Sequence, residues 1–202
     1  MKLIATPLGC VEDGVADGVV ILEPSVFRDD RGFFLETHNQ GKLDALGFRP
    51  RFVQDNHSKS KRGTLRGLHA QLHRPQGKLV RATAGSIFDV AVDLRLNSPT
   101  YRHWFGIELT AENFLQLYIP EGFAHGFFVL SETAEVQYKC TDLYDAEDEI
   151  SLRWNDEAIG DGGIIWPTSG AEPIVSPRDA QAPSLEELEP KLRDAAAYRV
   201  AD

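Results

Sequence analysis

The stretch Ile87-Phe88-Asp89-Val90-Ala91-Val92-Asp93-Leu94 is the clearest guide to how this chain folds. Within it, Phe88, Val90, Val92 and Leu94 occupy alternate positions. Alternate residues of a β-strand point to the same side of the sheet. The stretch therefore predicts a strand whose apolar face, formed by these four side chains, is buried in the core.

Further runs rich in β-branched or aromatic residues recur along the chain, separated by Gly, Pro, Asn and Asp. They span residues 18–24, 78–84, 86–94, 105–109, 115–119 and 135–140. Many short strands without long helical patterns between them favour an antiparallel all-β fold over an α/β fold. We therefore expect a jelly-roll barrel with short peripheral helices.

Helix is expected in two places. Residues 39–47 predict a short helix, and residues of about 184–194 predict a C-terminal one, because Ser184 and Glu187 have the spacing of a capping box. The sequence shows no internal repeat, linker or low-complexity segment. We therefore expect a single domain over residues 1–202.

The composition narrows the choice of partners. The chain of 202 residues carries a formal net charge of -10 at pH 7 and has a pI of about 5.1, so its surface repels phosphate backbones and argues against nucleic acid and anionic membranes. Cys10 and Cys140 are the only cysteines, without zinc-site spacing, which indicates a reduced intracellular protein. The opening apolar stretch is too short for a signal peptide, and no segment has the length of a membrane span. A cytoplasmic location is expected.

A histidine beside cations is the first candidate for chemistry. His69 follows Arg66 closely, Lys78 comes shortly after, and both segments resemble strands that we expect to form one hairpin. A histidine near neutrality can remove a proton, and a neighbouring cation can hold the negative charge that the removal creates. The alternative is an ordinary hydrogen-bonded core histidine, and position alone does not decide between the two.

A second histidine stands after a Pro-x-Gly turn, in Ile119-Pro120-Glu121-Gly122-Phe123-Ala124-His125. This arrangement is typical of the second motif of the cupin barrel, in which the histidine of metal-dependent members is a ligand. The other ligands should come from an earlier His-x-His and a Glu. Here His69 is followed by Ala70 and Gln71, and His73 lies too far along. The motif thus favours the fold more strongly than a metal site.

Two polar stretches remain ambiguous by themselves. Residues 29–36 contain Arg31, an aromatic pair and Glu36 after a turn-prone start, and residues 54–60 are dense in donors and acceptors. A turn entering a strand explains the first stretch without a ligand, and loops are often polar.

Taken together, these runs closely resemble the dTDP-4-dehydrorhamnose 3,5-epimerase family. The resemblance extends from about Gly18 to Pro183, with the motifs in family order, and is carried by residues 30–36, 54–58, 65–69, 76–81, 88–95, 119–127 and 138–139. It implies a cupin-type jelly-roll homodimer that needs no metal or organic cofactor. It also implies conversion of dTDP-4-dehydro-6-deoxy-D-glucose into dTDP-4-dehydro-L-rhamnose, in dTDP-L-rhamnose biosynthesis.

The resemblance also implies residue roles. His69 is expected to be the base, oriented by Asp179, with Lys78 facing the developing oxyanion and Tyr138 as the acid on the opposite face. Tyr138 shares the apolar side of its strand with Val136 and Cys140, which suits this role but also suits a plain core tyrosine. The expected substrate-binding residues are Arg31, Phe34, Glu36, Gln54, Asp55, Asn56, Arg66, His125, Tyr144, Glu149 and Arg178.

Three positions depart from the family pattern. Arg178 replaces the usual lysine, Ala70 stands where an aromatic is common, and Leu143 reduces an aromatic pair next to Tyr144. Each change alters the expected pocket around the sugar or the base.

One geometric conflict and three alternatives stay open. Strict alternation puts Arg66 and His69 on opposite faces, so a shared pocket predicts a bulge or bend at Gly67. The first alternative is an enzyme that inverts only C3 or only C5 of a related nucleotide deoxysugar. The others are a metal-dependent cupin enzyme using His69, His73 and His125, and a sugar-binding cupin without activity.

Overall fold

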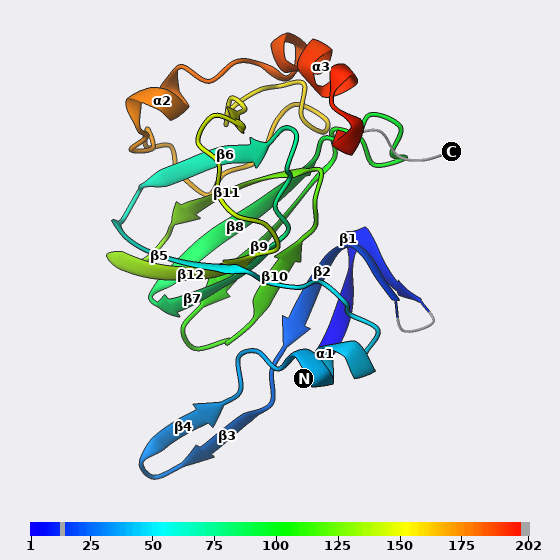
Figure 1. Cartoon of the computed structure of the whole chain (residues 1–202). Coiled ribbons are helices and arrows are strands. Elements are labelled where there is room, and N and C mark those ends of the chain that lie inside the picture. Colours follow the sequence, from blue (N-terminus) through cyan, green and yellow to red (C-terminus); the bar gives the residue numbers. More distant parts are fainter. Residues whose placement is uncertain (13–14, 199–202) are drawn as a thin grey trace.

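The structure is a computed structural model that describes residues 1–12 and 15–198 (Figure 1). Two antiparallel sheets lie face to face. The larger sheet has the order β1-β2-β10-β7-β12-β5, formed by β1 (Lys2–Glu12), β2 (Val15–Glu23), β10 (Gln116–Ile119), β7 (Lys78–Ala84), β12 (Thr133–Cys140) and β5 (Gln54–Lys61). The smaller has the order β13-β6-β11-β8-β9, formed by β13 (Glu149–Ser151), β6 (Leu65–Gln71), β11 (Phe123–Val129), β8 (Ser86–Asp93) and β9 (Trp104–Thr110). The expected all-β jelly-roll architecture is confirmed.

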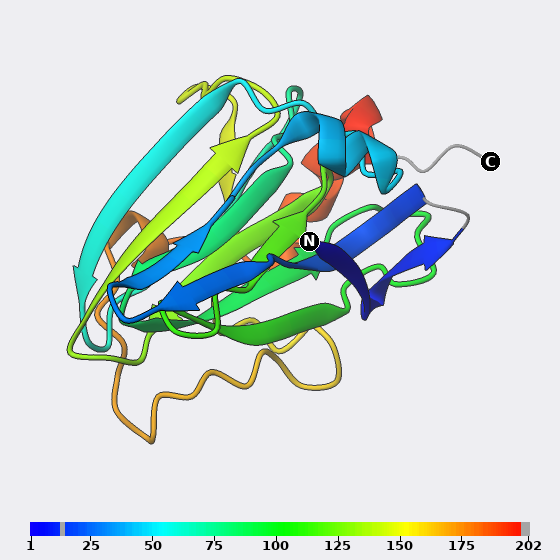
Figure 2. The same cartoon turned by 90° about the horizontal axis from the view of Figure 1, so that it is seen from below.

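The space between the sheets holds an apolar core to which both layers contribute. Val80 and Val136 from the larger sheet pack in one cluster with Ala91 and Phe127 from the smaller, and Figure 2 shows the two layers of strands from below. Burial of apolar side chains between two sheets is what keeps such layers together. Polar side chains within this layer are therefore unusual and mark the site.

Strand β8 is buried on both faces, which is more than its alternation predicts. At three of the four expected positions the prediction is confirmed, because Val90, Val92 and Leu94 are fully buried, whereas Phe88 is partly buried. These side chains pack outside the sheet against the C-terminal segment, whereas Ile87 and Ala91 point between the sheets. A central strand flanked by β11 and β9 cannot leave a face to solvent when a further layer covers it.

The C-terminal segment supplies that further layer. It contains α2 (Pro177–Ala180), α3 (Leu185–Asp194) and the 3-10 turn Ala196–Tyr198. Helix α3 begins after Ser184 with a complete capping box to Glu187, as expected from the sequence. The other expected helix is α1 (Gln40–Ala45), capped by Asn39. None of the described helices is long and apolar enough to cross a membrane.

The expected hairpin that joins His69 and Lys78 is wrong. His69 lies on β6 of the smaller sheet and Lys78 on β7 of the larger, so the connection between them crosses from one layer to the other. The two residues still meet, because the Lys78 Nζ atom donates to the backbone oxygen of His69 at 3.5 Å. The crossing places base and cation on facing walls of one space.

A separate two-stranded hairpin, β3 (Val26–Asp29) and β4 (Gly32–Leu35), projects from the body of the molecule (Figure 1). Its aromatic side chains are exposed, with Phe27 at 66%, Phe33 at 56% and Phe34 at 72%. Exposed aromatic clusters of this kind are uncommon on a chain that functions alone.

Candidate active site

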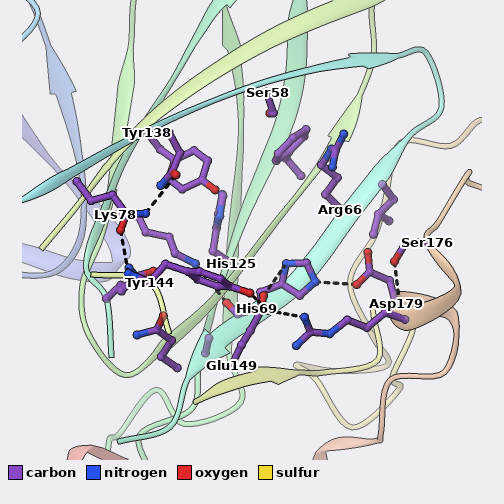
Figure 3. A pocket seen from close by; sticks show the side chains of 18 residues that line it. Ser58, Arg66, His69, Lys78, His125, Tyr138, Tyr144, Glu149, Ser176 and Asp179 are labelled. Carbon is purple, nitrogen blue, oxygen red and sulfur yellow. Dashed lines mark hydrogen bonds and ion pairs between the residues drawn. The ribbon is translucent and has the colours of Figure 1, made fainter. Parts of the chain in front are cut away.

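A cavity of about 430 Å³ opens between the two sheets (Figure 3). Eleven of the residues selected from the sequence line it: His69, Tyr138, Asp179, Lys78, Gln54, Asn56, Arg66, His125, Tyr144, Glu149 and Arg178. They come from both sheets, from α2 and from the loop after β12. The volume suits a small organic ligand.

The conflict over Arg66 and His69 is resolved by a bulge. In the pairing of β6 with β11, His69 lies opposite His125 and Arg66 lies opposite Phe127, so three steps on β6 match two on β11. The extra residue returns Arg66 to the face of His69. Gly67 permits it, because its φ is +112° and a Cβ there would meet the His125 carbonyl oxygen at 2.6 Å. The bend expected at Gly67 is confirmed.

His69 forms a short hydrogen bond to a buried carboxylate. Its Nε2 atom lies 2.6 Å from Asp179 Oδ1, and Asp179 is only 4% exposed. Burial would raise the pKa of Asp179, but the hydrogen bond and charge of His69, with further hydrogen bonds from Ser176 and the backbone of Gly67, hold that pKa below its ordinary value. The carboxylate therefore stays charged and fixes the imidazole with Nε2–H toward it.

The segment before α2 carries Asp179 to this position. Ile174 forms a parallel bridge to Thr64 just before β6, and its backbone pairs with Gly63 and Leu65. Ser176 then caps α2, with its Oγ accepting from the Asp179 backbone N–H at 3.0 Å. Residues more than a hundred positions apart along the chain are thereby joined at His69.

With Nε2 occupied, Nδ1 is the nitrogen of His69 that can take a proton from a ligand. Glu149 Oε1 lies 3.9 Å from it. Glu149 is itself held by the Tyr144 hydroxyl, which donates at 2.7 Å, and by an ion pair with Arg178. These groups form a polar rim beside the base.

Tyr138 and Lys78 stand on the facing sheet, opposite His69 (Figure 3). Tyr138 is half-buried, whereas Val136 and Cys140 on the same side of β12 are fully buried. Burial raises the pKa of Tyr138, so its phenol retains its proton. Burial also lowers the pKa of Lys78, an effect that Cys140, Glu149 and Asp89 oppose. A base on one wall with an acid and a cation on the other is suited to moving protons across a bound ligand.

Four of the selected residues lie outside the cavity of their own chain: Arg31, Phe34, Glu36 and Asp55. Arg31 and Phe34 are on the projecting β3–β4 hairpin, where Arg31 pairs with Asp29 at 2.6 Å. Glu36 bonds Lys42 at 2.8 Å. Asp55 lies outside the cavity for a local reason. Alternation along β5 points Gln54 and Asn56 toward the cavity and Asp55 away from it, where Asp55 pairs with Lys139.

The described residues offer no ligand set for the alternative of a metal-dependent enzyme. Among residues 1–12 and 15–198, no group of three or more His, Cys, Asp or Glu side chains is placed to hold a metal ion. His73 is exposed and does not line the cavity with His69 and His125.

Four polar wall residues were not selected in the sequence analysis: Ser58, Gln71, Gln76 and Ser176. The Ser-Pro pair at Ser176 is a helix-start signal that indicates α2, and with it the position of Asp179. Gln76 precedes Gly77-Lys78 directly but is tied to the backbone oxygen of Asp142 at 2.7 Å. No local pattern predicts that contact.

A His–Asp pair facing a tyrosine and a lysine between the sheets of a jelly roll defines a cupin-type acid–base isomerase. The chain belongs to the dTDP-4-dehydrorhamnose 3,5-epimerase family, whose model matches residues 15–187.

Two solved structures and one curated relative illustrate the likeness. The dTDP-4-dehydrorhamnose 3,5-epimerase of Salmonella typhimurium is 56% identical over 171 residues, which cover 84% of this chain and 91% of the relative. The crystal structure of dTDP-6-deoxy-D-glucose-3,5-epimerase RmlC from Legionella pneumophila, in complex with dTDP-4-keto-L-rhamnose, has a TM-score of 0.84 at 45% identity and covers 95% of this chain and 96% of that one. ChmJ, a 3'-monoepimerase from Streptomyces bikiniensis in complex with dTDP-quinovose, has a TM-score of 0.78 at 32% identity, with coverage of 86% and 87%.

Proposed function

We propose that this chain inverts C3 and C5 of dTDP-4-dehydro-6-deoxy-D-glucose to give dTDP-4-dehydro-L-rhamnose, in dTDP-L-rhamnose biosynthesis. The observation that carries the proposal is the placement of His69, oriented by Asp179 at 2.6 Å, across one cavity from Tyr138 and Lys78. Family membership agrees with it. The whole chain acts as one domain in this proposal, and its location is the cytoplasm, in keeping with the free thiol of Cys140.

Each inversion is a proton removal followed by a proton return. His69 Nδ1 takes the hydrogen from the carbon next to the C4 ketone, and the electrons of that C–H bond move onto the ketone oxygen to form an enolate. The Lys78 ammonium stabilises this oxygen, because a cation in a water-poor site acts strongly on developing charge. Tyr138 then donates its proton to the same carbon from the opposite face. No step in this scheme calls on a metal or an organic cofactor.

The diphosphate and base of the nucleotide require a separate set of contacts. Arg66 and Arg178 offer guanidinium forks to phosphate oxygens at the cavity rim. Gln54 and Asn56 present amides, and Tyr144, which is 51% exposed, offers a face for the thymine ring. His125 and Glu149 lie nearer to the catalytic histidine, His69, and face the sugar in this arrangement.

The remaining residues enter the proposal through a homodimer. Arg31 and Phe34 are 90% and 72% exposed on a hairpin that projects from the body of the molecule (Figure 1), and neither residue lines the cavity. In a twofold dimer the contacts are symmetric, so the hairpin of each subunit can reach the other subunit. We therefore assign Arg31, Phe34 and Glu36 to the nucleotide site of the other subunit, and leave Asp55 to its ion pair with Lys139.

Incubation with dTDP-4-dehydro-6-deoxyglucose in deuterated water tests the reaction. Deuterium should appear at both C3 and C5, followed by NMR, and L-configured product should form. Label at one carbon alone would instead support the monoepimerase that the likeness to ChmJ raises. Absence of label at both carbons would overturn the proposal.

The division of roles has its own test. Tyr138→Phe should retain exchange from the His69 face but lose inversion, because the donor on the opposite face is missing. Tyr118→Phe is the matched control, since Tyr118 is a buried tyrosine of the larger sheet that does not line the cavity. Full inversion in Tyr138→Phe would contradict the assigned role.

A further inference from the structure

A second histidine–carboxylate pair, which the proton transfers do not use, borders the cavity through its histidine. His125 Nε2 lies 2.7 Å from Asp89 Oδ1. Asp89 is fully buried on β8, and His125 is 6% exposed on β11. His125 lines the cavity between His69, its partner in the β6–β11 register, and Tyr138, whose ring centroid is 6.4 Å from its own.

Asp89 differs sharply from Asp93, which lies four residues further along the same strand and is equally buried. Asp93 accepts hydrogen bonds from Arg95, Ser98 and Thr100 and so stabilises a loop. Asp89 has His125 as its hydrogen-bond partner at Oδ1, and its buried Oδ2 atom has none among the residues that the structure describes. A buried carboxylate bonded at one oxygen alone is costly to the fold, so a structural role accounts poorly for it.

The geometry determines which nitrogen of His125 meets a ligand. Because Asp89 is an acceptor, it selects the tautomer with the proton on Nε2 and leaves a lone pair on Nδ1. A lone pair accepts from a hydroxyl and does not donate to a ketone oxygen. The sugar offers hydroxyls on C3, which is itself a reacting carbon, and on the neighbouring C2.

We propose that Asp89 is a positioning residue that holds His125 with its Nδ1 lone pair toward the cavity, where it accepts a hydrogen bond from a sugar hydroxyl and selects hydroxylated over deoxygenated substrates. The proposal rests on the proposed epimerase function for its substrate. A site built to bond a hydroxyl strongly rejects an analogue that lacks it. Asp89→Asn reverses the arrangement, because the amide can donate to Nε2 and move the proton to Nδ1.

The test follows deuterium exchange at C5, a carbon that all probes retain. Three substrates are compared: dTDP-4-dehydro-6-deoxyglucose and its analogues without the C2 or the C3 hydroxyl. The natural chain should prefer the full substrate over one analogue by on the order of 10²-fold or more in kcat/KM. Asp89→Asn should bring that ratio close to one. Asp93→Asn is the matched control, and it should retain the ratio even where stability falls.

A uniform loss of exchange on all three substrates in Asp89→Asn would overturn the proposal. That result would mean that Asp89 acts through stability or through its charge on Lys78 and has no part in hydroxyl selection. Equal use of all three substrates by the natural chain would overturn it as well.

The tautomer is measured separately, on the free protein and without substrate. Nitrogen NMR of histidine-labelled protein, with His125 assigned by its loss in His125→Gln, should show the proton on Nε2 and an unprotonated Nδ1. A proton on Nδ1 would contradict the proposal even if Asp89→Asn fails to fold. Because this measurement needs no turnover, failure of the epimerase function and failure of the positioning role are distinguishable.

Discussion

The cavity and the β3–β4 hairpin differ in where their polar and aromatic groups find partners. In the cavity, His69, Asp179, Tyr144 and Glu149 bond one another within a single chain. On the hairpin, Phe34 is 72% exposed and lies outside that network. The groups proposed for proton transfer thus lie together in one chain, whereas the proposed dimer would bring the hairpin to the nucleotide site of a second copy. Variants on the two sides should therefore fail in different ways.

The largest effect is expected from the base itself. His69→Ala should lower kcat by about 10³- to 10⁴-fold, the contribution usual for a general base, while the thermal midpoint stays near that of the natural chain. Deuterium wash-in at C3 and C5 measures it. His57→Ala is the control, because His57 is an exposed histidine of β5 outside the cavity. A comparable loss of kcat in both variants would contradict the role of His69 as the general base.

A smaller loss is expected on the hairpin side. Arg31→Ala combined with Phe34→Ala should raise KM by roughly 10- to 100-fold, since stacking on a base contributes about 1–3 kcal/mol, and should change kcat little. Steady-state kinetics separates the two parameters. A fall in kcat with unchanged KM would mean that the hairpin takes part in the chemical step. It would contradict the proposed difference between the cavity and the hairpin.

Mixing the two kinds of variant sharpens the contrast further. A dimer of one His69→Ala chain and one hairpin variant has one intact cavity served by an intact hairpin from its partner. At substrate concentrations well below the KM of the natural chain, where the hairpin variant is nearly inactive, random exchange of subunits should therefore restore about a quarter of the natural activity. Recovery requires that each hairpin serves the other subunit, and no recovery after verified exchange would assign each hairpin to its own chain.

The two regions also differ in how far sequence reasoning reached them. The positions of β2, β7, β8, β9, β10 and β12, the apolar face of β8 and the helix after Ser184 follow from local composition, periodicity and capping. The bulge at Gly67 was predictable because strict alternation would put Arg66 and His69 on opposite faces of the strand, although both were expected in the pocket.

What sequence reasoning missed depends on contacts between distant elements. Adjacent strands along the chain commonly pair, so β6 and β7 were expected in one hairpin, but the connection crosses between the layers. Arg31 and Phe34 were expected to bind substrate by resemblance, and no local pattern shows that their hairpin projects from the body of the molecule. Asp89 went unnoticed because alternation marked it as the polar face of a strand.

On the cavity side, a pH dependence is expected that the hairpin does not share. Burial lowers the pKa of Lys78, so its positive charge is lost as pH rises through a value below the ordinary lysine pKa near 10.4. Burial raises the pKa of Tyr138, so the phenol still carries its proton in that range. The alkaline decline of kcat should therefore report Lys78.

Lys78→Arg should move this decline to higher pH, because a guanidinium stays charged, although its altered shape reduces the rate at neutral pH. The pH profile of kcat measures the shift. Lys59→Arg is the control, as Lys59 pairs with Glu135 outside the cavity, and the hairpin variant should keep the natural profile. An unmoved alkaline limb in Lys78→Arg would assign the decline to another group.

The smallest effect expected is that of Phe34→Ala on the stability of the dilute chain. Its side chain is largely exposed, so the free energy of unfolding should change by less than about 0.5 kcal/mol. Phe127→Ala, in the cavity wall at 4% exposure, should cost about 3–5 kcal/mol. If Phe34 packs on a partner subunit, Phe34→Ala should be more destabilising at higher protein concentration. Association stabilises only those folded copies that make the contact. The difference in thermal midpoint between Phe34→Ala and the natural chain should therefore widen with concentration. A small, constant difference would mean that the exposed hairpin has no partner of its own kind.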